Sequence, residues 1–298
     1  MSYRELHRNG QLKQRVAELK QLLDPCQVCP RECGARRLQG ERGECGAGEV
    51  VEISGYGPHF GEEPPLVGRG GSGTIFFAFC SLACVFCQNY ETSRGRDRYP
   101  VDAGELAQIM LQLQERGCEN INLVTPTHYL PQIVEAVEVA CGLGLELPLV
   151  YNSSGYERLA TIRLLAGIID IYMPDLKYAN ADIARKYSRI HDYPQIAKAA
   201  LKEMHQQVGD LTLNERGVAV QGLLIRHLVL PGGLAGTAEL MQFIAEEISP
   251  TSWINVMDQY YPTYLAHRYP EIARRVTSEE FRQAIAAARQ ASPRFHLL

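Results

Sequence analysis

The chain has 298 residues, 46% of them hydrophobic, so it can bury the core of one large α/β domain with or without a small appendage, and gross disorder is excluded. Its net charge of −4 gives no overall basic field, which argues against nucleic acid as a partner. No apolar run is long enough to span a bilayer and the N-terminus lacks the apolar block of a signal peptide, so we expect a cytoplasmic protein without a membrane partner.

The N-terminal part predicts a helix followed by a metal-binding segment. Residues 1–24 have the pattern of a charged amphipathic helix, whereas residues 26–48 are rich in cysteine and glycine and too poor in apolar residues to form their own core. Small segments of this kind need a metal to hold their shape. Four thiolates suit tetrahedral zinc or an auxiliary iron–sulfur cluster, and the spacing leaves both open, including a purely structural zinc that fastens this segment to the barrel. The four are Cys26, Cys29, Cys33 and Cys45.

Six short apolar runs indicate the strands of a parallel sheet. Each run is almost continuously hydrophobic, as expected for strands that are buried on both faces. The runs cover residues 74–79, 120–125, 147–151, 168–173, 222–230 and 253–257.

Helical segments separate these runs. Residues 102–117 begin at Asp102, which is a suitable N-cap, and end at a glycine, and residues 130–144 repeat this format. The alternation of strands and helices predicts a parallel sheet, and about six units fall short of the eight in a closed barrel. We therefore expect an α/β fold with a partial (β/α)6 barrel over residues 59–298, preceded by the metal-binding segment in residues 1–58. The chemistry should lie at the C-terminal ends of the barrel strands.

Three further cysteines, Cys80, Cys84 and Cys87, follow the first apolar run in the spacing C-x3-C-x2-C. Cysteine thiolates are the usual ligands of a [4Fe-4S] cluster, and these short spacers let one loop supply three of them. One iron is then left open, as in reactive metal sites. The alternative is a closed zinc or structural cluster site completed by Cys118, Cys141 or a histidine, although both of these cysteines lie in helix-like segments where small buried thiols are common.

The three-cysteine motif, with Phe86 directly before its last cysteine, resembles the signature of the radical S-adenosylmethionine (SAM) superfamily. Together with the β/α units, the resemblance extends over residues 60–260. It implies that the amino and carboxylate groups of SAM bind the open iron. It also implies that an electron from the cluster cleaves SAM to methionine and a 5′-deoxyadenosyl radical, which abstracts a hydrogen atom from the substrate. Phe86 would lie at the adenine, with an ordinary core aromatic as the alternative.

Polar residues at the later strand ends fit the same resemblance. Asp175 and Lys177 resemble the Asp-x-Lys strand end of glycyl-radical-enzyme activating enzymes, which faces cofactor and substrate, and Arg226 resembles an arginine near the cofactor's carboxylate. An internal ion pair of Asp175 with Lys177 is the alternative. The second strand departs from the Gly-Gly-Glu-Pro of many relatives, so Thr125 there and Asn152 after the third strand are the candidate cofactor contacts, with helix capping as the alternative. Further candidates at these ends are Thr127, His128, Ser153, Ser154, Gln259 and Tyr260.

The N-terminal cysteines and residues 59–77 resemble a branch labelled pyruvate formate-lyase activating enzyme. This resemblance implies a protein or peptide substrate, such as a glycyl residue of a partner protein, and a flavodoxin or ferredoxin as electron donor. Radical modification of a small molecule or nucleotide is the second expectation. A non-catalytic iron–sulfur electron carrier or metal-binding scaffold is a third, but such a carrier needs no deep polar cavity at its strand ends.

Overall fold

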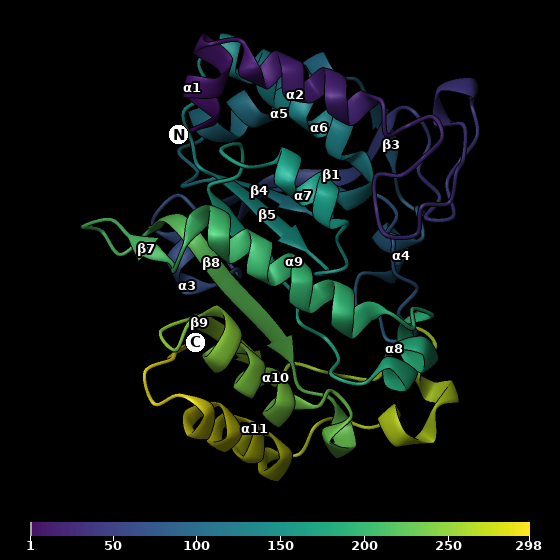
Figure 1. Cartoon of the computed structure of the whole chain (residues 1–298), viewed down its shortest axis with the longest axis vertical. Coiled ribbons are helices and arrows are strands. Elements are labelled where there is room, and N and C mark those ends of the chain that lie inside the picture. Colours follow the sequence, from purple (N-terminus) through teal and green to yellow (C-terminus); the bar gives the residue numbers. More distant parts are fainter. Residues whose placement is uncertain (1) are drawn as a thin grey trace.

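The computed structural model describes residues 2–298, and its centre is a set of six parallel strands that neighbour one another in chain order, β2-β4-β5-β6-β8-β9 (Figure 1). β1 pairs antiparallel with β2 at one edge and with β3 beyond it, β10 continues the other edge next to β9, and β7 pairs with β8. The strands are β1 (Val51–His59), β2 (Ser72–Phe77), β3 (Tyr99–Val101), β4 (Ile121–Val124), β5 (Leu149–Ser153), β6 (Ile171–Pro174), β7 (Thr212–Leu213), β8 (Ala219–Leu228), β9 (Trp253–Met257) and β10 (His296–Leu297).

The partial barrel predicted from the sequence is confirmed. Each of the six apolar runs forms one strand of the parallel set, and within residues 2–298 the edge strands β3 and β10 do not pair with each other, so the sheet stays open. β1 runs across the expected boundary at residue 58 and joins the N-terminal part to the barrel sheet.

Helices follow most of the parallel strands and cover the outer face of the sheet (Figure 1). They are α1 (Tyr3–Arg8), α2 (Gln11–Lys20), α3 (Pro64–Val67), α4 (Tyr90–Ser93), α5 (Ala103–Glu115), α6 (Leu130–Gly142), α7 (Leu159–Leu164), α8 (Ala181–Ser188), α9 (Tyr193–Val208), α10 (Thr237–Phe243) and α11 (Ser278–Ala291). α5 begins as predicted, because the Asp102 side chain accepts a hydrogen bond from the backbone N–H of Glu105. The N-terminal amphipathic pattern forms two helices instead of one, since Gly10 adopts a left-handed conformation with φ of 77°.

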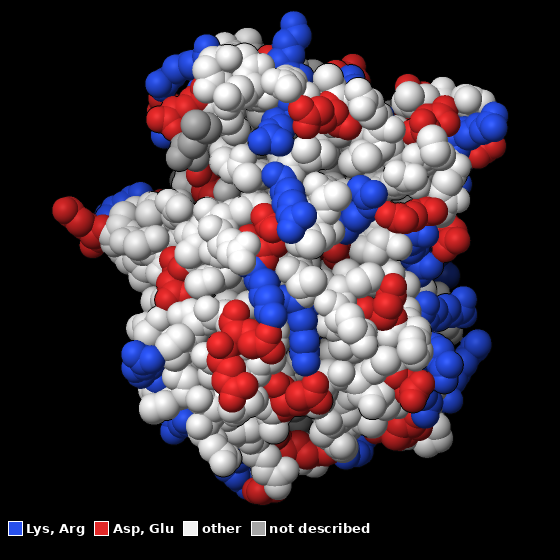
Figure 2. Space-filling model, in the orientation of Figure 1, with Lys and Arg blue, Asp and Glu red and all other residues white. Residues whose placement is uncertain are grey.

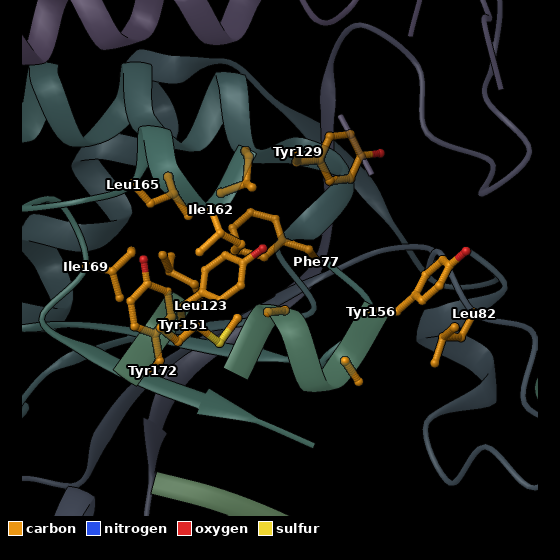
Figure 3. Packing of buried hydrophobic residues seen from close by; sticks show 14 of the residues in the cluster. Phe77, Leu82, Leu123, Tyr129, Tyr151, Tyr156, Ile162, Leu165, Ile169 and Tyr172 are labelled. Atoms are coloured by element: carbon orange, nitrogen blue, oxygen red, sulfur yellow. The ribbon is translucent and has the colours of Figure 1, made fainter. Parts of the chain in front are cut away.

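Successive residues along the strands face opposite sides of the sheet. Phe77, Leu123 and Tyr151 point to the helix side, where they pack with Ile162 of α7 and with Leu165 directly after this helix (Figure 3). Each of these side chains is essentially inaccessible to solvent, and burial of one such side chain stabilises the fold by about 2 kcal/mol. The intervening strand residues face the barrel interior, which is where the polar side chains gather.

The N-terminal end of the barrel interior is filled by the loop between β1 and β2. Leu66 of α3 packs there against Val150, Ile171 and Leu224 from three strands. The Asn120 side chain fixes this position by donating a hydrogen bond to the carbonyl of Leu66 at 2.8 Å. Access to the interior is therefore concentrated at the opposite end, where the strands terminate and the cysteine loop begins.

Charges of both signs are interspersed on the face shown in Figure 2. Over α9, Lys198 lies 3.0 Å from Glu239, and Lys202 pairs with Glu247. Exposed pairs of this kind add little stability. No helix in residues 2–298 is both long and apolar enough to cross a membrane.

Candidate active site

A cavity of about 360 Å³ opens at the C-terminal ends of the barrel strands and brings most of the expected site residues together. The three cysteines of the motif line it, and so do most of the strand-end residues expected to meet cofactor or substrate. Its lining includes Cys80, Cys84, Cys87, Phe86, Thr125, Asn152, Ser153, Ser154, Asp175, Lys177, Arg226 and Gln259. Residues in or directly after β2, β4, β5, β6, β8 and β9 thus contribute to one site.

The cysteine loop leaves β2 through an unusual backbone conformation. Phe79, directly before Cys80, has φ of 73°, which is rare for an aromatic residue. Its ring is held between the guanidinium groups of Arg42 and Arg98, which lie 5.5 and 5.2 Å from the ring centre. Since Arg42 belongs to the N-terminal segment, that segment helps to fix the start of the cysteine loop.

Each thiol of the motif has a hydrogen-bond partner. The backbone N–H of Leu82 donates to Cys80 Sγ at 3.4 Å, and Cys84 Sγ lies 2.9 Å from the hydroxyl of Ser188. Cys87 Sγ lies 3.3 Å from the hydroxyl of Ser93. Donors of this kind stabilise thiolates bound to a metal and influence the potential of a cluster.

These residues fit a [4Fe-4S] cluster with one open iron. Burial raises the pKa of Cys80 to about 12 and raises that of Cys84, so a cationic metal is needed to hold them as thiolates. No fourth cysteine lines the cavity. Within the described residues no three His, Cys, Asp or Glu side chains converge as a single metal ion requires, but a cubane cluster spreads its cysteine ligands over different iron atoms. The buried Nε of Arg94, whose Nη2 donates to Leu82 beside the loop, has no partner and provides a further donor there.

Asp175 connects the two cations of the cavity. Its carboxylate lies 2.5 Å from Lys177 Nζ and 2.9 Å from Arg226 Nε. Burial alone would raise the pKa of Asp175, but the charges of Arg226 and Lys177 lower it below its ordinary value. The ion pair considered from the sequence is therefore formed, and all three charged groups also face the cavity.

Some of the candidate residues at the ends of β4 and β5 face the cavity, whereas others are bonded elsewhere in the core. Thr125 has φ of 59°, a strained conformation for a β-branched residue, and faces the cavity beside Asn152. Thr127 donates instead to the carboxylate of Glu157, and the His128 ring contacts the carbonyl of Ala78 at 2.7 Å. The hydroxyl of Thr127 and the imidazole of His128 are thus occupied in the core outside the cavity.

Phe86 is buried at the cavity wall. Its ring makes edge contacts with Tyr178 and Tyr260, with centroids 6.4 and 5.7 Å apart. The Tyr260 hydroxyl donates to the carbonyl of Ile272, so this tyrosine supports Phe86 and does not line the cavity. Phe86 also lines the cavity, so a ring such as adenine bound there would lie beside it.

The four N-terminal cysteines gather in one segment that packs on the barrel. A β-carbon at Gly43 would lie 3.3 Å from Cys33 Sγ and 3.4 Å from Cys45 Sγ, so the two sulfurs flank this glycine. Burial raises the pKa of Cys29 to about 12, and negative charge on Cys45 or Cys26 would raise it further. Four thiols suit zinc or an iron–sulfur cluster by their chemistry, but within residues 2–298 no three of them converge as a single metal ion requires.

Polar contacts join this N-terminal segment to the barrel near the cysteine loop. The buried guanidinium of Arg37 donates to the carbonyl of His128 at 2.7 Å, and Arg31 Nε donates to the carbonyl of Ser81 at 2.5 Å. The Thr161 hydroxyl donates to the carbonyl of Val28. The other two cysteines, Cys118 and Cys141, lie outside both groups and do not line the cavity.

The sequence reading did not identify two ionisable residues of the cavity, His59 and Glu62. They belong to the end of β1 and the loop that fills the barrel interior. The only signal was the adjacent acidic pair, Glu62 and Glu63, in an otherwise apolar and glycine-rich stretch.

Comparison with known proteins agrees with this site. The model of the Radical SAM superfamily matches residues 74–213, which include the three-cysteine loop. An uncharacterized protein of Methanocaldococcus jannaschii is 31% identical over 284 residues, which cover 92% of this chain and 77% of that protein.

Two solved structures match at low identity, and the first of them shows the same fold. HydG, a maturase of the [FeFe]-hydrogenase, has a TM-score of 0.51 and 14% identity over 74% of this chain and 49% of its own. SuiB of Streptococcus suis, solved with its precursor peptide SuiA, has a TM-score of 0.48 and 15% identity over 74% of this chain and 46% of its own. The chain thus spans about half the length of these two structures.

Residues 74–213 form a Radical SAM superfamily domain, and a domain of this family implies a [4Fe-4S] cluster and SAM.

Proposed function

We propose that Cys80, Cys84 and Cys87 bind the [4Fe-4S] cluster, and that SAM occupies the remaining iron and the cavity beside it. The observation that carries this proposal is that three hydrogen-bonded thiols, without a fourth, line the same cavity as the polar strand ends. When SAM is bound and the cluster is reduced, the two together would supply a 5′-deoxyadenosyl radical. Phe86 would support the adenine.

The remaining cavity residues orient the cofactor and exclude water. Thr125 and Asn152 provide polar contacts from adjacent strand ends. Asp175, held between Lys177 and Arg226, would remain ionised and face cofactor and substrate. Its pairing keeps the two cations in fixed positions, which is the preorganisation that radical chemistry requires.

The proposed reaction is removal of a hydrogen atom from a carbon of a protein or peptide substrate, such as a glycyl residue of a partner protein. Support comes from the resemblance of the Asp175 and Lys177 strand end to activating enzymes. A flavodoxin or ferredoxin would supply the electron, in the cytoplasm. The N-terminal cysteines would hold zinc or an auxiliary iron–sulfur cluster, and the contacts of Arg31 and Arg37 support a role in fastening the cysteine loop.

A second candidate is radical modification of a small molecule. It is favoured by His59 and Glu62, which add ionisable groups inside a cavity of a size typical for small ligands.

Deuterium transfer distinguishes the two candidates. The reconstituted, reduced enzyme is incubated with SAM and an anaerobic deuterated cell extract that has been separated by size, and 5′-deoxyadenosine is analysed by mass spectrometry. Deuterium delivered by the macromolecular fraction alone supports the protein or peptide substrate. Deuterium delivered only by the small-molecule fraction contradicts it and supports the second candidate. Cys84→Ala, which removes one cluster ligand, controls for label that enters without radical chemistry.

A further inference from the structure

The loop between β1 and β2 places two acidic residues, Glu62 and Glu63, in the barrel interior, and we call this pair the acidic floor. Glu62 lines the cavity, and Glu63 follows it immediately in the buried part of the loop. The loop reaches across the interior to β9, because Asn255 Nδ2 donates to Glu63 Oε1 at 3.0 Å. This loop lies outside residues 74–213, the part that matches the superfamily model.

The charges on this floor do not balance. Asp175 neutralises much of Lys177 and Arg226 at 2.5 and 2.9 Å, whereas Glu63 lies 3.8 Å from Arg226. Among residues 2–298, no salt bridge reaches Glu62. Three carboxylates, of which Asp175 and Glu62 line the cavity, thus lie near two cations at its inner end.

The free hydrogen-bonding atoms of the floor are acceptors. Asn122 Nδ2 donates to Glu62 Oε2 at 2.9 Å, which leaves the buried Oδ1 of Asn122 without a partner. Oε2 of Glu63, a residue that is 5% exposed, also lacks a partner. Neither Asn122 nor Glu63 lines the cavity, so the carboxylate of Glu62 is the acceptor that N–H groups of a ligand would meet there.

We propose that Glu62 binds a protonated nitrogen group of the substrate, an amine or a guanidinium, and so determines which substrates enter the cavity. The proposal rests on the proposed radical chemistry only in calling this ligand the substrate. Two observations support it: Glu62 lines the cavity with no salt bridge to it within residues 2–298, and carboxylates outnumber cations beside it. His59 also lines the cavity. A phosphate or carboxylate placed against Glu62 would meet like charge and bind more weakly.

The residues around Glu62 also shift the pKa of its carboxyl group. Burial and the neighbouring carboxylate of Glu63 raise the pKa of Glu62, while Arg226, the Asn122 hydrogen bond and His59 oppose this. A bound cation would lower that pKa again, so binding of the cation should strengthen as pH rises.

The test uses three small probes. Butylguanidinium is compared with butylurea, which has the same shape but no charge, and with butylammonium, which has the same charge but another shape. The protein is the reconstituted enzyme saturated with SAM and left unreduced, so that the probes cannot occupy the SAM position. Binding is followed by saturation-transfer NMR titration. We expect butylguanidinium or butylammonium to bind wild type about tenfold more tightly than butylurea, as one charged hydrogen bond provides.

Two carboxylate variants locate the effect. Glu62→Gln should weaken binding of the charged probe about tenfold and leave butylurea unchanged, whereas Glu115→Gln, on the exposed end of α5, should have no effect. Glu62→Asp, which retains the charge, should restore part of the affinity. Iron content and thermal unfolding of each variant establish that it is folded and loaded.

Equal binding of charged and neutral probes, absence of saturable binding of both charged probes, or unchanged binding by folded Glu62→Gln would overturn the proposal. The same samples, once reduced, are assayed for 5′-deoxyadenosine. Product formation without selective binding contradicts the cation site and leaves the proposed function intact. Selective binding without product supports the cation site and counts against the proposed function.

Discussion

Gly46 lies directly against the aromatic ring of Phe79, so closely that a β-carbon on Gly46 would be 2.5 Å from Cδ1 of that ring. Gly46 follows Cys45, the last of the N-terminal cysteines, and Phe79 precedes Cys80, the first cysteine of the motif. This van der Waals contact joins the two cysteine groups, in addition to the contacts of Arg31 and Arg42 with the cysteine loop. Distortion at either residue should be felt at the other group.

Gly46→Ala should destabilise the protein by about 3 kcal/mol and reduce iron binding at the three-cysteine loop. The added β-carbon overlaps the Phe79 ring, and φ of 97° is unfavourable for alanine. Gly217→Ala is the matched control, because Gly217 also has positive φ, 74°, but nothing within 4 Å of the added carbon. It should cost about 1 kcal/mol and leave iron content unchanged. Thermal unfolding and iron per chain, measured anaerobically, compare the two. Similar losses in both variants would show that the contact with Phe79 has no importance.

Glu157 should make stability fall as pH rises from 4.5 to 7. Burial raises its pKa to about 7, although hydrogen bonds from Thr127 and Tyr151 oppose the shift. The folded state therefore keeps a proton that the unfolded state loses above its ordinary pKa of 4.5. The stabilisation is complete below pH 4.5 and is lost through pH 7, with a total change of about 3 kcal/mol.

Glu157→Gln removes the titrating carboxyl group, so the free energy of unfolding should depend less on pH between 4.5 and 7. Urea unfolding at pH 5 and pH 8 measures the effect as the difference between wild type and variant. The variant should gain stability relative to wild type at the higher pH. A wild type that becomes relatively more stable as pH rises would contradict the raised pKa.

Thr125→Gly should separate cofactor binding from stability. The substitution relieves the strain of a β-branched residue at φ of 59°, which should raise the free energy of unfolding by about 1 kcal/mol. It also removes a hydroxyl from the cavity wall, so we expect SAM affinity to fall about tenfold. Equilibrium dialysis with the unreduced, reconstituted enzyme gives the affinity. Unchanged SAM binding would show that the Thr125 hydroxyl has no role in holding the cofactor.

The strand framework could be predicted because parallel strands buried on both faces have a distinctive composition. The runs that became β2 and β4 are apolar almost throughout, and the polar residue that follows each marks the functional end of the sheet. Arg226 could be predicted for a related reason, since a charge within an apolar strand needs a polar cavity or a partner, and it has both.

The floor of the cavity could not be predicted in the same way. β1 contains glycine and proline within its span and pairs antiparallel, so its composition gave no indication of a strand. The position of Glu62 depends on the long-range contact of its neighbour Glu63 with Asn255, 192 residues further along the chain. The break between α1 and α2 at Gly10 was also missed, because the amphipathic pattern continues across it.

Formation of 5′-deoxyadenosine tests the central claim most directly. Wild type and Cys84→Ala, with Cys118→Ala as a cysteine control away from the cavity, are reconstituted anaerobically with iron and sulfide, and iron, sulfide and zinc are quantified. Each sample then receives dithionite and SAM, and the product is measured by mass spectrometry. We predict 5′-deoxyadenosine from wild type and Cys118→Ala and none above background from Cys84→Ala. Equal product from Cys84→Ala, or none from a wild type with an intact cluster and bound SAM, would contradict the assignment of this cavity as a radical SAM site.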